Sequence, residues 1–517
     1  MSLDDVAPIL IAGQWRPPTA VDVFVAENPA TGQMLPARYA RSAWSDAEAA
    51  LDAAAAASVV LQALPTDRLA AFLRDYADRL ESRADDICRM AAEETGLAVA
   101  PRLRDIELPR TTNQLRQAAA AATDNTWRLP VIDAKAGLAS MLEPLGPVVV
   151  MGPNNFPLAY NSISGGDFAA AIAAGNPVIA IAHPNHPSTC RLLAECAHAA
   201  AVAAAMPVGT VQLLYGLSRD DGLRLVADAR VGAAAFTGSR RAGLALKAAA
   251  DAVGKPIYLE MSSVNPLVIL PGALAERAED VLTELIASAL MAAGQFCTSP
   301  GLVFLTEGPA TDAFLAEWAK RYREASCGTL FGRTTRDGLA AGIQALVDAG
   351  AQVLCGNRSA DRAGYAWANT LLRVSGDQFL HSPEALQAEV FGNACLAVVV
   401  SGLDQLEQAV GLLEGNLTGC IYSARDGRDD AAYDQIARKL RPRVGRLLND
   451  KMPTGVAVSP AMNHGGPFPA TGHPHFTAVG LPAALRRFTR LACYDHVRPH
   501  RLPAALRNLH AATTPDP

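Results

Sequence analysis

A cysteine in a turn bounded by glycine and proline is the first candidate for chemistry in this chain. Cys297 lies in residues 293–301, Ala-Gly-Gln-Phe-Cys-Thr-Ser-Pro-Gly, between a predicted helix and an apolar strand. Such a turn exposes its side chains, so a thiol there can meet a substrate as a nucleophile. The remaining cysteines fall mostly in helical or strand patterns, where a thiol packs as a small apolar group.

Two polar residues follow predicted strands and are candidates to assist such a nucleophile. Glu260 ends the apolar strand 257–260, and the carboxyl end of a parallel strand is where open α/β sheets bind ligands. The alternative for Glu260 is an acid at a strand end that faces solvent. Asn155 follows the strand that ends at Met151. Its side-chain amide can donate to an oxyanion, or it can cap the helix that follows.

A glycine-rich element at residues 236–243, Phe-Thr-Gly-Ser-Arg-Arg-Ala-Gly, follows a predicted strand and opens a predicted helix. Backbone N–H groups there, the helix dipole and the Ser239 hydroxyl can hold a pyrophosphate. The alternative is an ordinary turn between a strand and a helix. The standard G-x-G-x-x-G fingerprint, the P-loop and the G-x-S-x-G elbow of α/β-hydrolases are all absent from the sequence.

Two histidine pairs raise the question of a metal. His183 and His186 flank Pro184-Asn185, and His473 and His475 flank Pro474. Neither pair has a carboxylate at the spacing of the H-E-x-x-H zinc motif, so we predict no metal site.

These residues must be positioned by helices and strands, and the predicted secondary structure differs between the first part of the chain and the part after residue 145. Helical patterns cover residues 47–63, a stretch that begins at 65–67, and residues 85–94 and 109–122, and Ser45-x-x-Glu48 has the spacing of a capping box. From residue 145, short apolar strands alternate with helices, which predicts βαβ units and mainly parallel sheets. We expect two α/β lobes, with irregular pieces at 128–147 and beyond 475.

Composition restricts the class of protein. The 517 residues are 50% hydrophobic and 19% charged, which excludes a disordered chain, and the net charge of −6 includes no basic stripe for nucleic acid. The nine cysteines are scattered without a C-x-x-C, which fits a reducing compartment. Asp4 and Asp5 stand where a secretory signal carries positive charge, and the longest uncharged stretch, 168–182, is shorter than the ~18 residues of a membrane span. We expect a cytoplasmic globular protein without a nucleic-acid or membrane partner.

Taken in order, the candidate motifs resemble the aldehyde dehydrogenase superfamily from about Asn28 to Cys493. The motifs that carry this resemblance are Asn155-Phe156-Pro157, Phe236-Thr237-Gly238-Ser239, Glu260, Gly294-Gln295-x-Cys297 and Glu389-Val390-Phe391-Gly392. Further segments resemble the bacterial α-ketoglutarate semialdehyde (2,5-dioxopentanoate) dehydrogenases and the NADP-dependent fatty aldehyde dehydrogenases near them. They include Glu94-Thr95-Gly96-Leu97, Gln114-Leu115-Arg116, Phe156-Pro157-Leu158-Ala159, Gly165-Gly166-Asp167, His183-Pro184-x-His186-Pro187, Ser263-Val264-Asn265-Pro266 and residues 464–471, His-Gly-Gly-Pro-Phe-Pro-Ala-Thr.

The resemblance implies a fold with two Rossmann-like parallel-sheet α/β domains and a small β arm for oligomerisation. Residues 1–127 and 148–259 match the cofactor domain, 260–475 the catalytic domain, and 128–147 with 476–500 the arm, which leaves 501–517 as a C-terminal tail. The same resemblance implies a homodimer or a dimer of dimers.

The resemblance also assigns roles. Cys297 matches the thiolate that attacks the aldehyde, Asn155 and the Cys297 backbone N–H match the oxyanion donors, and Glu260 matches the base that hydrolyses the thioester after hydride leaves for NAD or NADP. The positions that match cofactor contacts are Asn154, Gly238, Ser239, Gly243, Glu389 and Phe391. Phe156 and Phe296 are expected to line an aromatic funnel for the aldehyde, with ordinary core packing as the alternative.

One position departs from the family pattern. Where the family places a lysine that bonds the adenine ribose, this chain has Ile181, which has no donor to offer. The loss would weaken cofactor binding by ~1.5–3 kcal/mol unless Arg240, Arg241 or His183 compensates, and it leaves the choice between NAD and NADP open. Two alternatives to a dehydrogenase therefore remain at the level of sequence. They are a cofactor-independent esterase or thioesterase that uses Cys297, and a non-catalytic homologue.

Overall fold

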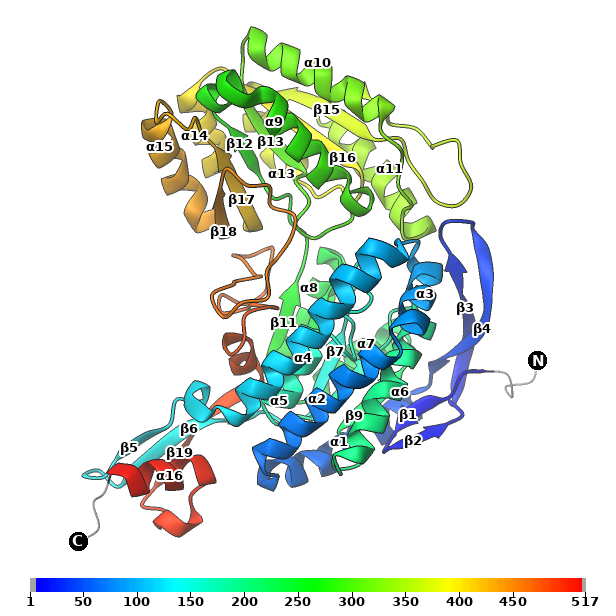
Figure 1. Cartoon of the computed structure of the whole chain (residues 1–517), viewed down its shortest axis with the longest axis vertical. Coiled ribbons are helices and arrows are strands. Elements are labelled where there is room, and N and C mark those ends of the chain that lie inside the picture. Colours follow the sequence, from blue (N-terminus) through cyan, green and yellow to red (C-terminus); the bar gives the residue numbers. More distant parts are fainter. Residues whose placement is uncertain (1–5, 514–517) are drawn as a thin grey trace.

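A sheet of seven strands forms the first lobe of the computed structural model, which describes residues 6–513 (Figure 1). The strand order is β11-β10-β7-β8-β9-β1-β2, parallel from β11 to β9 and antiparallel where β1 and β2 extend the edge. The strands are β1 Ile9–Ile11, β2 Gln14–Arg16, β7 Val148–Met151, β8 Val178–Ile181, β9 Val211–Leu214, β10 Ala233–Thr237 and β11 Ile257–Glu260. The central strands are short and mostly apolar, as expected where helices cover both faces of a sheet, and Gln212 in β9 is a buried polar exception.

Helices on both faces of this sheet complete the first lobe. They are α1 Trp44–Ala63, α2 Thr66–Ser82, α3 Ala84–Thr95, α4 Leu108–Thr123, α5 Gly166–Ala173, α6 Pro187–Ala203, α7 Arg219–Ala227 and α8 Arg240–Asp251. The expected helices in this half are all present. The capping box is wrong, because α1 begins at Trp44 with Ala43 as its N-cap and Ser45 already lies inside the first turn.

The N-terminal region contains strands that the sequence did not reveal. Besides β1 and β2, a two-stranded ribbon joins β3 Ala20–Asn28 to β4 Gln33–Ser42. Strands of three residues carry no readable period, and the ribbon is too exposed to show a clean apolar alternation. The first part of the chain was predicted to be largely helical, and that prediction is wrong before residue 43.

The second lobe is built on another sheet of seven strands, ordered β14-β15-β16-β13-β12-β17-β18. Its strands are β12 Leu267–Ile269, β13 Leu302–Thr306, β14 Gln352–Cys355, β15 Thr370–Ser375, β16 Ala394–Val400, β17 Asn416–Tyr422 and β18 Val444–Asn449. Its helices are α9 Pro271–Leu290, α10 Pro309–Glu324, α11 Arg333–Asp348, α12 Gly376–His381, α13 Pro383–Leu386, α14 Leu403–Gly411 and α15 Asp430–Leu440. Only β14 runs antiparallel to its neighbour, so the expected pair of parallel-sheet lobes is confirmed.

A three-stranded antiparallel arm projects from the first lobe (Figure 1). It consists of β5 Val131–Asp133, β6 Leu138–Pro144 and β19 Thr489–Asp495. The C-terminal helix α16, Ala504–Thr513, packs against it through a small apolar cluster that contains Met141 and Leu506.

A long segment without regular secondary structure, residues 450–482, connects β18 back to the first lobe (Figure 1). Its end inserts Phe476, Ala478 and Val479 into the first lobe's core. Near its middle, Ala470 accepts a hydrogen bond from the Met261 backbone N–H just beyond β11. We call residues 450–482 the connecting segment.

No single helix within residues 6–513 has both the length and the apolar composition of a membrane span, although α1 and α2, bent by 120° at their junction, meet that test as a pair. Asp4 and Asp5 lie outside the described residues.

Candidate active site

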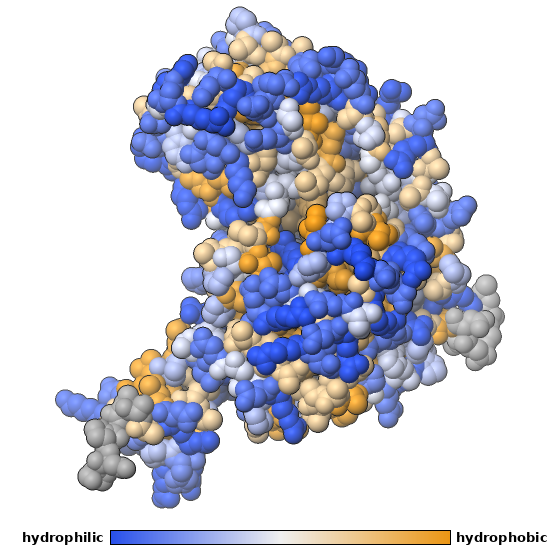
Figure 2. Space-filling model, in the orientation of Figure 1, coloured by the Kyte–Doolittle hydropathy of each residue, from blue (hydrophilic) through white to orange (hydrophobic). Residues whose placement is uncertain are grey.

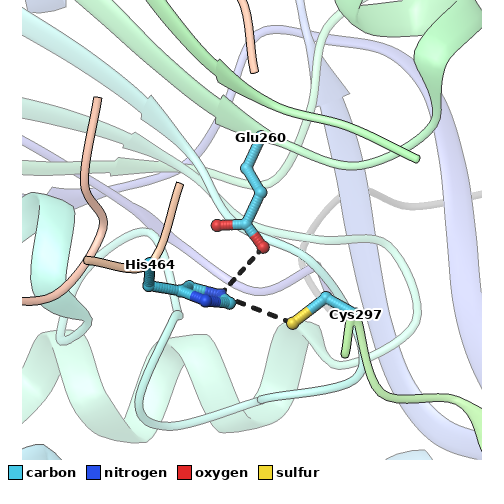
Figure 3. A group of neighbouring side chains, drawn as sticks. All are labelled: Glu260, Cys297 and His464. Carbon is cyan, nitrogen blue, oxygen red and sulfur yellow. Dashed lines mark hydrogen bonds and ion pairs between the residues drawn. The ribbon is translucent and has the colours of Figure 1, made fainter. Parts of the chain in front are cut away.

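Three side chains from distant parts of the chain meet where the two lobes join (Figure 3). Glu260 ends β11, Cys297 follows the short 3-10 turn Met291–Gly294, and His464 lies in the connecting segment. The Cys297 Sγ lies 3.4 Å from His464 Nε2, and the same nitrogen lies 3.1 Å from Glu260 Oε1. All of their reactive atoms fall within 4.8 Å of one another.

Backbone geometry fixes the turn that presents the thiol. Gly294 has a φ of +69°, and a Cβ there would lie 2.2 Å from the Gly392 carbonyl oxygen, so only glycine fits. After the turn, the Asn265 side-chain amide donates to the carbonyl oxygens of Cys297 and Ser299, each at 2.9 Å. The nucleophile candidate therefore stands on a loop whose backbone is held on both sides.

The surroundings keep the Cys297 thiol protonated at rest. Burial raises its pKa well above the usual value, and the nearby carboxylate of Glu260 raises it further, while the charge of Arg110 acts in the opposite direction. A thiol is a weak nucleophile, so this cysteine needs a base to become a thiolate. Glu260 and His464 are both nearly fully buried beside it.

Asn155 turns its side chain toward the loop of Cys297. Its Nδ2 donates to the carbonyl oxygen of Gln295 at 3.0 Å, and it does not cap a helix. Arg102 donates to the Asn155 carbonyl oxygen at 3.2 Å and so fixes its backbone as well. The amide therefore lies next to the segment that carries the thiol, as an oxyanion donor must.

A cleft of about 570 Å³ opens beside these residues, at the carboxyl ends of β7, β8, β10 and β11. This is the edge at which open parallel sheets bind nucleotides. Its lining residues are Gly152, Pro153, Asn154, Asn155, His183, Phe236, Thr237, Gly238, Ser239, Ala242, Glu260, Met261, Ser262, Cys297, Thr334, Thr335, Gly338, Leu339, Glu389 and Phe391. Among the positions that match family cofactor contacts, only Gly243 is missing from this lining.

The glycine-rich element forms a turn between β10 and α8 that also borders the cleft. Ser239 caps α8, since its hydroxyl accepts the Ala242 N–H at 3.4 Å, and it also lines the cleft. A Cβ on Gly238 would come within 2.7 Å of the Phe236 ring. Gly243 is buried instead, and a Cβ there would meet the Met261 sulfur at 2.9 Å, so it permits close packing of α8.

Glu389, which also lines the cleft, has a shifted pKa. Burial raises its pKa to about 7, against the opposing effect of hydrogen bonds from Ser262 and the Ser263 backbone. Phe391 lies near it on the same wall. Two carboxyl groups and an aromatic ring thus line the part of the cleft that adjoins Cys297.

Ile181 offers no donor at the end of β8, but His183 lines the cleft two residues later. Burial lowers the pKa of His183 to about 3, so its ring is neutral. Its Nδ1 accepts the Asn185 N–H at 3.2 Å, which leaves Nε2 as the N–H donor. Of the other two residues considered as substitutes, Arg240 is paired with Glu414 at 2.8 Å, and Arg241 is exposed outside the cleft lining.

Aromatic rings flank Cys297 on a side that does not belong to the cleft. The rings of Phe156 and Phe296 lie 5.0 Å apart, and Tyr160 packs on Phe156 at 5.2 Å and on His464 at 5.6 Å. Phe156 and Phe296 are therefore neighbours at the site, as the funnel interpretation requires. Arg102 stacks on Phe156 at 4.5 Å and forms an ion pair with buried Glu107.

Two more arginines lie near this site and form no ion pair with a carboxylate within residues 6–513. Arg110 donates to the Tyr160 hydroxyl at 2.8 Å and to the Val456 carbonyl oxygen at 2.9 Å. Arg446 donates to the carbonyl oxygens of Gly455 and Pro453. Burial lowers the pKa of Arg446, and the groups whose charges act on it are Cys297, Tyr160 and Arg110. Two unpaired positive charges thus lie close to the nucleophile.

Sequence reasoning missed His464, Tyr160, Arg110 and Arg446. His464 opened a segment that carried the resemblance, yet it lies 167 residues from Cys297 and has no local partner that would mark it as reactive. The arginines sit among many others of the same type, and only the fold separates paired from unpaired ones.

Among the described residues, the side chains that could bind a metal together are not the histidine pairs considered in the sequence. The His183 and His186 rings stack at 5.2 Å, and His186 is bonded to the Pro153 carbonyl oxygen and Cys190. Glu260, Cys297 and His464 instead form a set of potential metal ligands. A cation there would occupy the nucleophile candidate and its neighbouring bases together.

Comparison with known proteins agrees with this geometry. The sequence model described as the aldehyde dehydrogenase family matches residues 15–466. The chain is 37% identical to alpha-ketoglutaric semialdehyde dehydrogenase 2 of Azospirillum brasilense, over 95% of this chain and 94% of that enzyme. It is 33% identical to alpha-ketoglutaric semialdehyde dehydrogenase of Acinetobacter baylyi, over 95% and 93%. Among solved structures, 1-pyrroline-5-carboxylate dehydrogenase from Thermus with bound NAD superposes with a TM-score of 0.81 at 22% identity, covering 94% of this chain and 92% of that one.

Proposed function

The chain belongs to the aldehyde dehydrogenase family, and from that premise we propose that it oxidises a semialdehyde that carries a carboxylate group. It is an oxidoreductase that converts an aldehyde to the acid with a nicotinamide cofactor.

The acylation half of the reaction is assigned to Cys297 and Asn155. The Cys297 thiolate attacks the aldehyde carbon, and the new oxyanion lies between the Asn155 amide and the Cys297 backbone N–H. Removing one such donor costs ~10²–10³ in rate. The residues that line the adjacent cleft would hold a nicotinamide cofactor, which would accept the hydride that leaves this carbon. A thioester on Cys297 remains.

The hydrolytic half is assigned to Glu260. Its Oε2 is buried without a hydrogen-bond partner among the described residues, and it borders both the cleft and the thiol. A carboxylate in that position can take a proton from a water that attacks the thioester. The acid is then released and the thiol regenerated.

The observation that carries the substrate proposal is the pair of unpaired arginines, Arg110 and Arg446. Both guanidinium groups are half-buried without a counter-ion, and a bound carboxylate would pair with them through charged hydrogen bonds. The aromatic rings of Phe156, Tyr160 and Phe296 would enclose the short apolar part of the molecule between its two ends. A semialdehyde with one carboxylate, such as 2,5-dioxopentanoate, has this shape, and alpha-ketoglutaric semialdehyde is the substrate for which both relatives are named.

Cofactor contacts follow from the cleft lining. The pyrophosphate is assigned to Gly238 and Ser239 at the start of α8, the nicotinamide ribose to Glu389, and the ring to Phe391. Asn154 and the His183 Nε2–H face the same cleft, and His183 replaces the missing lysine as donor to the adenine ribose. A Cβ on residue 238 would clash with the Phe236 ring, so glycine is required there, and without a side chain its backbone can approach a phosphate closely.

NAD is the preferred coenzyme in this proposal. Neither lysine nor arginine is among the residues that line the cleft, and His183 is neutral. The 2′-phosphate of NADP calls for a cation, whereas the hydroxyl of NAD needs only a hydrogen bond. We expect kcat/KM to be higher with NAD, and a preference for NADP would contradict the assignment.

For the described residues we propose the domain roles that the resemblance implies: the first lobe binds the cofactor, the second lobe carries catalysis, and the arm of β5, β6 and β19 serves oligomerisation. The arm is smaller than expected at one end, because Phe476, Ala478 and Val479 pack in the core of the first lobe. The nine cysteines, all free of disulfides, support a cytoplasmic location.

The test compares aldehydes that differ only in the distal carboxylate. Arg110→Leu and Arg446→Leu should each raise KM for 2,5-dioxopentanoate or succinate semialdehyde about ten- to a hundredfold, because a charged hydrogen bond is worth ~1.5–3 kcal/mol. KM for pentanal and butanal should change little. Arg110→Lys and Arg446→Lys, which keep the charge, serve as controls. Equal losses for both kinds of aldehyde would refute carboxylate recognition by these arginines.

A further inference from the structure

The ribbon of β3 and β4 reaches from the first lobe to the second (Figure 1). Its turn, residues 27–32, which we call the ribbon tip, contacts the loop between β14 and β15. The Tyr365 backbone N–H donates to the Pro29 carbonyl oxygen at 2.8 Å, and the Tyr365 hydroxyl donates to Glu27 Oε1 at 2.5 Å. Gly364 has a φ of +72°, and a Cβ there would lie 2.3 Å from the Pro29 carbonyl oxygen, so glycine is needed for this close approach. The ribbon tip is therefore bonded to the second lobe through both backbone and side chain.

Tyr365 is also bonded to the segment that leads into α11. Its carbonyl oxygen accepts the Leu330 N–H at 2.8 Å. The guanidinium carbons of Arg333 and Arg336, both near the start of α11, lie 5.6 Å and 5.3 Å from the centre of its ring, within the range of a cation–π attraction. The Tyr365 side chain is buried between these partners. One residue thus connects the ribbon tip to the start of α11.

The start of α11 forms part of the cofactor cleft. Four of its residues are in the cleft lining, namely Thr334, Thr335, Gly338 and Leu339. Most of the other lining residues belong to the first lobe, so the cleft is bounded by both lobes. Just before α11, the Phe331 carbonyl oxygen accepts a hydrogen bond from Asn185 of the first lobe at 3.1 Å. The shape of the cleft therefore depends on how the start of α11 is held against the first lobe.

The same segment is bonded to the loop that carries the nucleophile candidate. Two residues before Cys297, the Gln295 side-chain amide donates to the Thr329 carbonyl oxygen at 2.9 Å and accepts the Phe331 N–H at 2.8 Å. Thr329 also packs on the end of α3, where a Cβ on Gly96 would lie 2.7 Å from its methyl group. A displacement of this segment would therefore reach both the cleft and the loop of the thiol.

We propose that Tyr365 is a positioning residue for the nicotinamide cofactor, because it braces the start of α11 against the ribbon tip of the first lobe. Two lobes that share a cleft can open and close about their connections. A ligand binds with an affinity reduced by the fraction of molecules that are in the competent arrangement. The bonds of Tyr365 favour the arrangement in which α11 borders the cleft. Breaking them should weaken cofactor binding, although Tyr365 itself does not line the cleft.

The test measures binding of NAD or NADP, whichever the wild type binds more tightly, so it is independent of the proposed substrate and coenzyme preference. Tyr365→Phe removes only the bond to Glu27, and calorimetric titration should give a dissociation constant about two- to tenfold higher, the range of one hydrogen bond. Glu27→Leu should have the same effect, and the double variant should bind no more weakly than either single variant. Glu27→Gln keeps an oxygen that accepts from the Tyr365 hydroxyl and should bind like the wild type.

Tyr422→Phe is the matched control. The Tyr422 hydroxyl also donates to a carboxylate, that of Glu284, but both residues lie in the second lobe outside the cleft lining. This variant should leave the dissociation constant unchanged. An equal loss of affinity in Tyr422→Phe, or an unchanged affinity in Tyr365→Phe, would overturn the proposal.

Hydrogen exchange without cofactor gives a second measurement. Exchange should be faster in Tyr365→Phe than in the wild type in peptides that cover residues 329–339, and saturating coenzyme should reduce the difference. Faster exchange confined to β3 and β4 would contradict the brace, because α11 would then be held without the ribbon tip. A wild type that binds neither coenzyme would contradict the cofactor assignment instead, and exchange at 329–339 would decide the brace alone.

Discussion

At the scale of single residues, the site contains ionisable groups whose pKa values are shifted from their usual range. Cys297 is held as a thiol, Glu389 titrates near neutrality, and His183 stays neutral, each mainly because burial penalises the charged form. Their roles therefore depend on pH in ways that can be measured.

Glu389→Gln should remove a pH dependence of cofactor binding. The carboxylate accepts the ribose hydroxyls in the proposed complex, so NAD affinity should fall as the pH drops through about 7 and the group is protonated. In the variant, binding should be weaker at pH 8 and nearly flat from pH 6 to 8. Titration of NAD by intrinsic fluorescence gives the dissociation constants. A wild-type affinity that does not vary with pH would contradict the ribose assignment.

The same carboxyl should affect stability without cofactor. Because its pKa in the folded protein is raised from 4.5 to about 7, folding favours the protonated form. Its contribution is fully present below about pH 4.5 and is lost as the pH rises through about 7. Denaturant unfolding of Glu389→Gln should show less of this decline than the wild type.

The sequence supported some site residues better than others. Cys297, Glu260 and Asn155 each follow a strand or turn signal, and the fold brings them to one place. His464 and Arg110 could not be assigned because their contacts join distant parts of the chain, and Arg446 could not because only the fold shows that it has no carboxylate partner among the described residues. A linear pattern records neither property.

At the scale of elements, the ends of parallel strands decide what the cleft can bind. β8 ends at Ile181, where a charged donor would reach the cofactor edge of the sheet. The apolar strands and helices of both lobes were predictable from periodicity and composition. The strands β1 to β4 were not, because short or exposed strands owe their structure to pairing partners elsewhere in the chain.

Ile181→Lys should strengthen cofactor binding. The new ammonium at the end of β8 adds a charged donor worth ~1.5–3 kcal/mol, or a ten- to hundredfold lower dissociation constant for NAD. Calorimetric titration measures it, with Ile181→Met as an uncharged control of similar length. His183→Ala should act in the opposite sense. Unchanged affinity in both variants would show that neither position faces the ribose.

The start of α6 depends on a carboxyl from α3. Glu94 accepts the backbone N–H groups of Ser188 and Thr189, each at 2.8 Å, and the Thr189 hydroxyl at 2.7 Å. Glu94→Ala leaves these buried donors unsatisfied and should lower the free energy of unfolding by about 2–4 kcal/mol. Chemical denaturation measures the loss, and the exposed neighbour Glu93→Ala should cost little. Equal effects of the two substitutions would contradict this account of the helix start.

At the scale of the whole molecule, the arm exposes apolar side chains and an unpaired strand edge that a monomer leaves uncovered. β19 is an edge strand of a three-stranded sheet, and Leu491 on it is 69% exposed. Val131, Leu138 and Leu129 add further exposed apolar surface to the same region, and Figure 2 shows apolar side chains where the arm joins the first lobe. An exposed edge with apolar side chains favours pairing with a second copy.

Leu491→Asp should therefore shift the protein from a dimer, or a dimer of dimers, toward a monomer. Light scattering at micromolar concentration measures the mass, and Val253→Asp, exposed on another part of the surface, is the matched control. A wild-type chain that is already monomeric under these conditions would refute the oligomer.

The most direct test of the central claim is the rise in reduced-nicotinamide absorbance when purified protein meets NAD and an aldehyde. The panel contains 2,5-dioxopentanoate, succinate semialdehyde, a medium-chain aliphatic aldehyde and benzaldehyde, with Cys297→Ala as control. We predict the highest kcat/KM for 2,5-dioxopentanoate and no signal in the control. A signal that survives in Cys297→Ala, or a folded wild type that oxidises none of the panel at saturating NAD or NADP, would contradict the account.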